Sequence, residues 1–136
     1  GYDTDELPAF YSRSGGLRVP LRRDTAAEIA AVMAAKWALG LGGGLVIANP
    51  IPAEAEIPAA SIAAHIETAL AEAAAEGVQG KAVTPFLLAR LEQLSGGASL
   101  EANVALVLNN AGLAAEIAAA YAGVERAAAP VSYSRG

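Results

Sequence analysis

The feature that most constrains this chain is one short apolar run, Leu45-Val46-Ile47-Ala48, which lies between three glycines and the pair Asn49-Pro50. Four residues are too few for a helix, and an apolar run between Gly and Pro is typical of a buried strand. A buried strand needs hydrogen-bonding neighbours on both edges. The chain offers only two other strand-like runs, Phe10-Tyr11 and Leu17-Arg18-Val19, and both are short. The run therefore predicts a sheet whose other strands lie outside this chain.

Helical patterns account for most of the remaining residues. The clearest one begins at Thr25, where Thr25 and Glu28 have the spacing of a capping box and Gly40 provides a left-handed stop. A second begins at Thr84-Pro85, with Thr84 expected as the cap and proline at the first helical position. Four helices are predicted in all, at about 26–39, at about 59–76, from Thr84-Pro85 to just before Gly96-Gly97, and from near Ser99 to about Tyr121.

Together these elements predict a soluble, helix-rich α/β protein that is incomplete on its own. An alternative is an all-α bundle with residues 43–49 threaded beside it, which would act as a non-catalytic helical interaction module. Alanine supplies about a quarter of the 136 residues and raises the apolar fraction to 54% without adding large side chains. Small side chains let helices pack closely, so composition does not decide between the two.

Composition excludes several function classes. The chain has no cysteine, which removes disulfides, zinc fingers and thiol nucleophiles, and fits a reducing compartment. Its formal net charge of -5 provides no basic field for nucleic acid. No apolar stretch of about 18 residues free of charge occurs, so no membrane span is expected, and no secretory leader opens the chain.

The ionisable residues identify no reaction. His65, the one histidine, has no ligand partner at metal-binding spacing. Lys36 borders the apolar face of its helix, and Lys81 precedes a helix without the spacing of a phosphate-binding loop. The acidic residues Asp3, Asp5 and Glu6 are expected to be solvated charges of a terminal loop.

Asparagine amides are the more interesting candidates. Asn49 ends the apolar run, at the edge where open α/β sheets place ligands. Asn103 lies in the first turn of the last predicted helix, and Asn109-Asn110 follow on it. An amide both donates and accepts hydrogen bonds, so it can read the edge of a uracil-like ring, or it can simply bond to nearby backbone. A third hypothesis is therefore a nucleotide-binding regulator that uses Asn49 and Asn103 without chemistry.

Four segments in matching order and spacing resemble the C-terminal part of the pseudouridine-5'-phosphate glycosidase family. They are Gly1-Tyr2-Asp3-Thr4-Asp5-Glu6-Leu7-Pro8-Ala9-Phe10-Tyr11, Gly43-Gly44-Leu45-Val46-Ile47-Ala48-Asn49-Pro50-Ile51-Pro52, Thr84-Pro85-Phe86-Leu87-Leu88-Ala89-Arg90 and Asn103-Val104-Ala105-Leu106-Val107-Leu108-Asn109-Asn110-Ala111. The resemblance covers residues 1–122. Residues 123–136 do not share it and are expected to be a disordered or non-native tail.

The resemblance implies the helix-rich C-terminal part of an α/β/α sheet domain. It implies a cytoplasmic, homotrimeric enzyme that reversibly cleaves the C–C bond of pseudouridine 5'-phosphate to give uracil and ribose 5-phosphate. The family holds the opened sugar as an imine on a lysine, uses a glutamate as proton donor, and anchors a divalent metal, typically manganese, through an aspartate.

In the family those catalytic and metal-binding groups lie upstream of the segment that matches Gly1, and neither Lys36 nor Lys81 matches the nucleophile. Asn103 is the one substrate-binding residue that carries over, as a residue of the base site. The resemblance therefore implies a partner, the N-terminal portion of the same protein, without which this chain is inactive, and it implies no nucleic acid or membrane partner.

Overall fold

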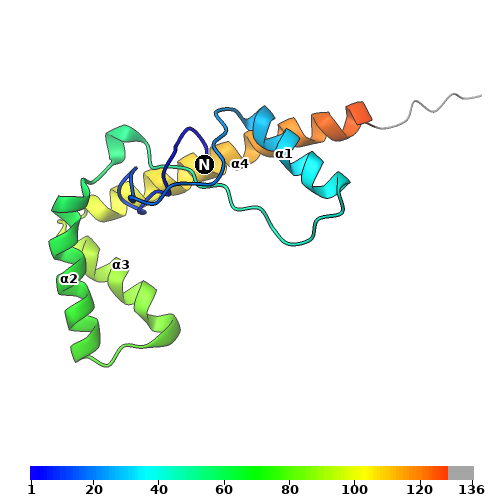
Figure 1. Ribbon diagram of the computed structural model, residues 1–136. Helices are drawn as coiled ribbons and strands as arrows, with labels where there is room; N and C mark the ends of the chain where they lie inside the picture. Colours follow the sequence, from blue (N-terminus) through cyan, green and yellow to red (C-terminus); the bar gives the residue numbers. More distant parts are fainter. Residues whose placement is uncertain (129–136) are drawn as a thin grey trace, which may run out of the picture.

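The computed structural model describes residues 1–128, which form four α-helices and two short 3₁₀ turns (Figure 1). In chain order the elements are α1 (Ala26–Ala38), η1 (Ala53–Ala55), α2 (Ala59–Ala75), η2 (Gly80–Ala82), α3 (Val83–Leu94) and α4 (Ala98–Ala128). The long helix α4 contacts α1, α3 and η1. The α2–α3 hairpin lies at its N-terminal end and α1 packs along its later turns (Figure 1).

Helix α1 forms where the sequence predicts it. Thr25 accepts the Glu28 amide at 3.2 Å, and the Glu28 carboxylate accepts the Thr25 amide at 3.0 Å, so the capping box is complete. The last helical residue is Ala38, and Gly40 follows the C-cap Leu39 with a φ of 68°, in the left-handed region that glycine tolerates. Local chemistry alone fixes both ends of this helix.

Two helix boundaries differ from the prediction. The prediction that Thr84 caps α3 is wrong, because the η2 turn runs directly into the helix and places the cap at Ala82. Helix α4 continues to Ala128, so residues 123–128 of the expected tail are helical. Residues 129–136, the rest of that expected tail, lie outside the described residues.

The predicted strand at 45–48 is not formed. Within residues 1–128 the only β pairing is three isolated bridges, Tyr2 with Arg23, Glu6 with Arg18 and Ala9 with Ser12. Residues 45–48 make one backbone hydrogen bond within residues 1–128, from the Tyr2 amide to the Ala48 carbonyl at 2.9 Å. A strand exists only through pairing, and these residues provide no neighbour for it. The helix-rich half of the α/β prediction is confirmed, and the sheet is absent from the described chain.

Two separate apolar clusters stabilise the fold. The larger one is centred on Ile51, which is fully buried, and joins the N-terminal loop to the α2–α3 hairpin and the first turns of α4. Its other buried members are Tyr11, Ile62, Ala69, Leu91, Ala102 and Leu106. The smaller cluster joins Ile29 of α1 to Leu113 and Ile117 of α4, with Ile47 of the apolar run packed against it.

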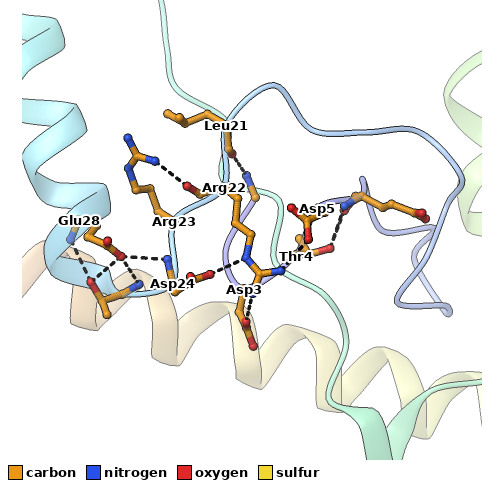
Figure 2. Close-up of polar contacts among 11 residues, drawn as sticks. Asp3, Thr4, Asp5, Leu21, Arg22, Arg23, Asp24 and Glu28 are labelled. Atoms are coloured by element: carbon orange, nitrogen blue, oxygen red, sulfur yellow. Dashed lines mark hydrogen bonds and ion pairs between the residues drawn. The ribbon is translucent and has the colours of Figure 1, made fainter.

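Charged side chains organise the N-terminal loops. Figure 2 shows the Arg22 guanidinium between three carboxylates, with Asp3 and Asp24 at 2.6 Å and Asp5 at 2.9 Å. Glu6 accepts hydrogen bonds from the Ser14 hydroxyl and the Gly16 amide, and these lower the pKa of Glu6. The acidic residues Asp3 and Asp5 are exposed as expected, and they also form ion pairs that join the two ends of the segment 1–24.

Helix α4 is unusually apolar for its length. Its segment Ala98–Glu125 contains an 18-residue window with a mean hydropathy of 1.4, and it is long and apolar enough to cross a membrane by length and composition. One such helix is weak evidence for a span, because the core helix of a soluble protein meets the same criterion. Much of this apolar character comes from alanine.

Candidate functional site

A cluster of asparagine amides joins the end of the apolar run to α4. The Asn49 amide nitrogen donates to the Asn110 side-chain oxygen at 2.9 Å, and Asn109 donates to the Pro50 carbonyl at 3.0 Å. Side chains of consecutive helical residues point about 100° apart. Asn110 can therefore bond to the Asn49 side chain while Asn109 bonds to the backbone of Pro50. These bonds fix the chain where it leaves the run.

Two mostly apolar hollows flank the run. One, of about 270 Å³, lies between the run, the loop at 19–23 and α1. The other, of about 500 Å³, lies between the run, the loop at 7–10 and α4. Val46 lines both hollows and is 88% exposed. Residues 1–128 therefore leave Leu45 and Val46 uncovered, while Ile47 is partly buried.

Asn103 lies in a different hollow, of about 260 Å³, between α3 and α4. Its neighbours there are Tyr11, Leu88, Ala89, Glu92, Ser99 and Leu100. Asn103 is half-buried, and its amide has no hydrogen-bond partner among residues 1–128. Its donor and acceptor atoms are thus free to bind a ligand in this hollow.

Tyr11 and Ser99 form the buried wall of the Asn103 hollow. Burial raises the pKa of the Tyr11 hydroxyl, and a hydrogen bond with Ser99 offsets part of that effect. Tyr11 therefore stays a neutral phenol near neutral pH. A buried aromatic residue beside an amide without a partner among the described residues is a suitable arrangement for a planar ligand with polar edges.

The structure does not bring Asn49 and Asn103 together. Asn103 and Asn110 lie seven residues apart on α4, which is about 10 Å along the helix, and Asn49 bonds to Asn110. The two amides line different hollows. They therefore do not meet at the edge of one ring, and a nucleotide-binding regulator that uses Asn49 and Asn103 stays a hypothesis.

The candidate nucleophiles are not directed at the Asn103 hollow. Lys36 donates to the carbonyls of Leu41, Gly42 and Gly43, and Lys81 is exposed. Nδ1 of His65 is buried and unpaired with any group in residues 1–128. Neither lysine of the chain, nor its histidine, therefore lines the Asn103 hollow.

No set of three or more His, Asp or Glu side chains within residues 1–128 could hold a metal ion. At the place where Asp3, Asp5 and Asp24 converge, the Arg22 guanidinium occupies the space between the three carboxylates. The described residues therefore do not fit a resident divalent cation.

Sequence reasoning assigned no role to Asn109 and Asn110 beyond their presence on the helix. The available signal was a pair of amides on an otherwise apolar helix. Arg13 was also missed: it donates to the Ile51 carbonyl at 2.6 Å, while its amide donates to Glu56 at 2.8 Å. Nothing in the local sequence around Arg13 indicates those partners, which lie about forty residues away.

Comparison with known proteins gives consistent matches. The family model described as indigoidine synthase A like protein matches residues 1–120. A pseudouridine-5'-phosphate glycosidase from Nocardioides sp. is 58% identical over 123 residues, which is 90% of this chain and 40% of that protein. One from Methylobacterium nodulans is 60% identical over 123 residues and is matched over 36% of its length. The chain thus spans about two fifths of the length of these curated relatives.

Solved structures match the fold over nearly the whole chain. The prealnumycin C-glycosynthase AlnA, crystallised with ribulose 5-phosphate, has a TM-score of 0.81 and 34% identity over 93% of this chain and 41% of AlnA. An indigoidine synthase A-like protein from Thermotoga maritima has a TM-score of 0.76 and 40% identity over 87% of this chain and 38% of its own. The described helices therefore have the arrangement of one part of a larger domain.

Proposed function

Because this chain belongs to the indigoidine synthase A-like family, within its pseudouridine-5'-phosphate glycosidases, we propose that it is the C-terminal portion of such an enzyme. The intact protein would reversibly cleave the C–C glycosidic bond of pseudouridine 5'-phosphate to give uracil and ribose 5-phosphate. The observation that carries the proposal is the identity of 58–60% to glycosidases over 90% of the chain.

The uncovered apolar run supports the view that the chain is one part of an α/β/α domain. Leu45 and Val46 are 40% and 88% exposed, and hollows flank the run on both sides. Strands from the N-terminal portion would fill these hollows and pair with the run, which would become a buried strand. The partner is then the rest of the same protein, and the sheet forms only when both parts are present.

The proposed reaction explains why ordinary glycosidase chemistry is not expected. A C-glycosidic bond has no heteroatom leaving group, so two carboxylates in the usual arrangement would not break it. An imine between the opened sugar and a lysine provides an electron sink for C–C cleavage. Lys36 is occupied by three carbonyls and Lys81 lies on the exposed surface, so we place this lysine and the proton-donating glutamate in the N-terminal portion.

Any divalent metal would also be held by that portion. The described residues provide no suitable donor set, and the manganese of the family has no ligand here. We therefore derive no step of the reaction through a metal. The further expectations of a cytoplasmic homotrimer remain part of the proposal.

In this proposal the chain itself contributes recognition of the base. The imide edge of uracil alternates acceptors and a donor, and the unpaired amide of Asn103 can match one acceptor and one donor of that edge. The neighbouring hollow of about 260 Å³ has room for a single pyrimidine ring beside Tyr11. Asn103 therefore binds and orients the base and takes no part in bond breaking.

The direct test is an assay of uracil release from pseudouridine 5'-phosphate by the intact protein with manganese. Release of uracil together with ribose 5-phosphate is expected, and the 136-residue chain alone should give none. No release by the intact protein would contradict the proposal. A cooperative, monomeric unfolding transition of the chain alone would then favour the helical interaction module.

A further inference from the structure

Lys36 has an unusual set of contacts at the end of α1. Its ammonium group donates to three consecutive carbonyls, those of Leu41 at 2.8 Å, Gly42 at 2.6 Å and Gly43 at 3.0 Å. An ammonium group has three donors and no acceptor, so this arrangement uses all of its hydrogen-bonding capacity. The cation also lies 5.5 Å from the centre of the Trp37 ring and near the negative end of the helix dipole.

The loop that Lys36 holds would otherwise be very mobile. Four of the five residues from 40 to 44 are glycine, which loses more conformational freedom on ordering than any other residue. Backbone bonds to α1 hold only its beginning, through the amides of Gly40 and Leu41. Among the described residues, the Lys36 ammonium is the one group that hydrogen-bonds to Gly42 or Gly43.

The apolar run begins directly after this loop. Its far end is tied by the Tyr2 amide on the Ala48 carbonyl and by the bond between Asn49 and Asn110. Between Gly44 and Ile47 no backbone hydrogen bond is made within residues 1–128. Residues 44–47 thus make no backbone hydrogen bond to the described chain, while the chain is held on either side of them. Lys36 holds the side before the run.

The geometry points to Lys36 as a positioning residue. Its three hydrogen bonds fix the glycine loop, and this holds residues 45–48 in position before the strands of the N-terminal portion pair with them. The contacts carry this inference independently of which reaction the intact protein performs. A cationic side chain suits the role because its several N–H donors can meet neighbouring carbonyls at once, and no carboxylate competes for Lys36 within residues 1–128.

The test compares Lys36 with Lys81, the only other lysine of the chain and an exposed residue. The intact protein is prepared in four forms: unchanged, K36M, K36R and K81M. Limited chymotrypsin digestion is followed by mass spectrometry at Leu39, Leu41 and Leu45. We expect cleavage in this loop to be at least about tenfold faster in K36M, which corresponds to the loss of one charge-assisted hydrogen bond. K81M should match the unchanged protein, and K36R should restore most of the protection.

A second measurement uses the unchanged protein. Acylation of a lysine requires its hydrogen bonds to break, so Lys36 should react with an amine-specific ester at least about fivefold more slowly than Lys81. Equal reactivity, or equal cleavage of K36M and the unchanged protein, would overturn the inference. A lowered thermal midpoint of K36M that K36R does not restore would also overturn it, since that result indicates a general loss of stability. Failure of the uracil assay would leave these comparisons valid, so the two proposals can fail separately.

Discussion

Replacing Val46 with aspartate should destabilise the intact protein and leave the chain alone almost unchanged. Val46 is 88% exposed in the described chain. Full burial of a valine side chain is worth about 1.5–3 kcal/mol, so covering the exposed part would contribute about 1.3–2.6 kcal/mol. The fraction already buried contributes only about 0.2–0.4 kcal/mol on the same scale.

The aspartate loses this gain and also brings a charge into an apolar hollow, which adds a desolvation cost. V46D should therefore lower the free energy of unfolding of the intact protein by at least about 1.3–2.6 kcal/mol, which urea unfolding measures. It should leave the helical circular dichroism signal of the chain alone unchanged. The chain alone is the matched control, because it carries the same substitution without the partner strands. An intact protein that tolerates V46D as well as the chain does would refute the claim that the run is covered.

Three further predictions concern the described residues. N103A should weaken uracil binding to the intact protein by about 1–3 kcal/mol; isothermal titration measures this, and an unchanged affinity would remove Asn103 from the base site. I51A should destabilise the fold by about 2–5 kcal/mol because Ile51 is fully buried in the larger cluster; a loss below about 1 kcal/mol in urea unfolding would show that this cluster is not a core. Arg90 lowers the pKa of Glu72 through their hydrogen bonds, so the stabilisation from Glu72 is present at neutral pH and is lost as the pH falls through that lowered pKa. In E72Q the urea midpoint should therefore fall less steeply between about pH 6 and pH 3 than in the unchanged protein. An equally steep fall would contradict the pairing of Glu72 with Arg90.

The parts of the fold that depend on neighbours in sequence could be predicted. Thr25, Glu28 and Gly40 define α1 because capping and left-handed glycine geometry act over a few residues. The start of α3 could not be predicted from Thr84-Pro85, because a preceding 3₁₀ turn leads into the helix and shifts its start toward the N-terminus. Short-range signals thus give the existence of a helix more securely than its first residue.

The apolar run shows where such reasoning stops. Its composition indicates a buried strand, and its flanking hollows agree with that environment. Yet pairing is a property of two segments, and within residues 1–128 no second segment pairs with the run. The same limit applies to the site. The bond between Asn49 and Asn110 joins residues 61 positions apart, and no pattern near either residue indicates the other.

Hydrogen exchange of the backbone amides at 45–47 tests the central claim most directly. Those amides have no acceptor within residues 1–128. In the chain alone they should exchange at close to the unprotected rate. In the intact protein, where the run would pair with strands of the N-terminal portion, exchange should slow by at least about a hundredfold. Equally fast exchange in both would contradict the account, because the run would then be a surface loop and the chain would supply no strand to a larger sheet.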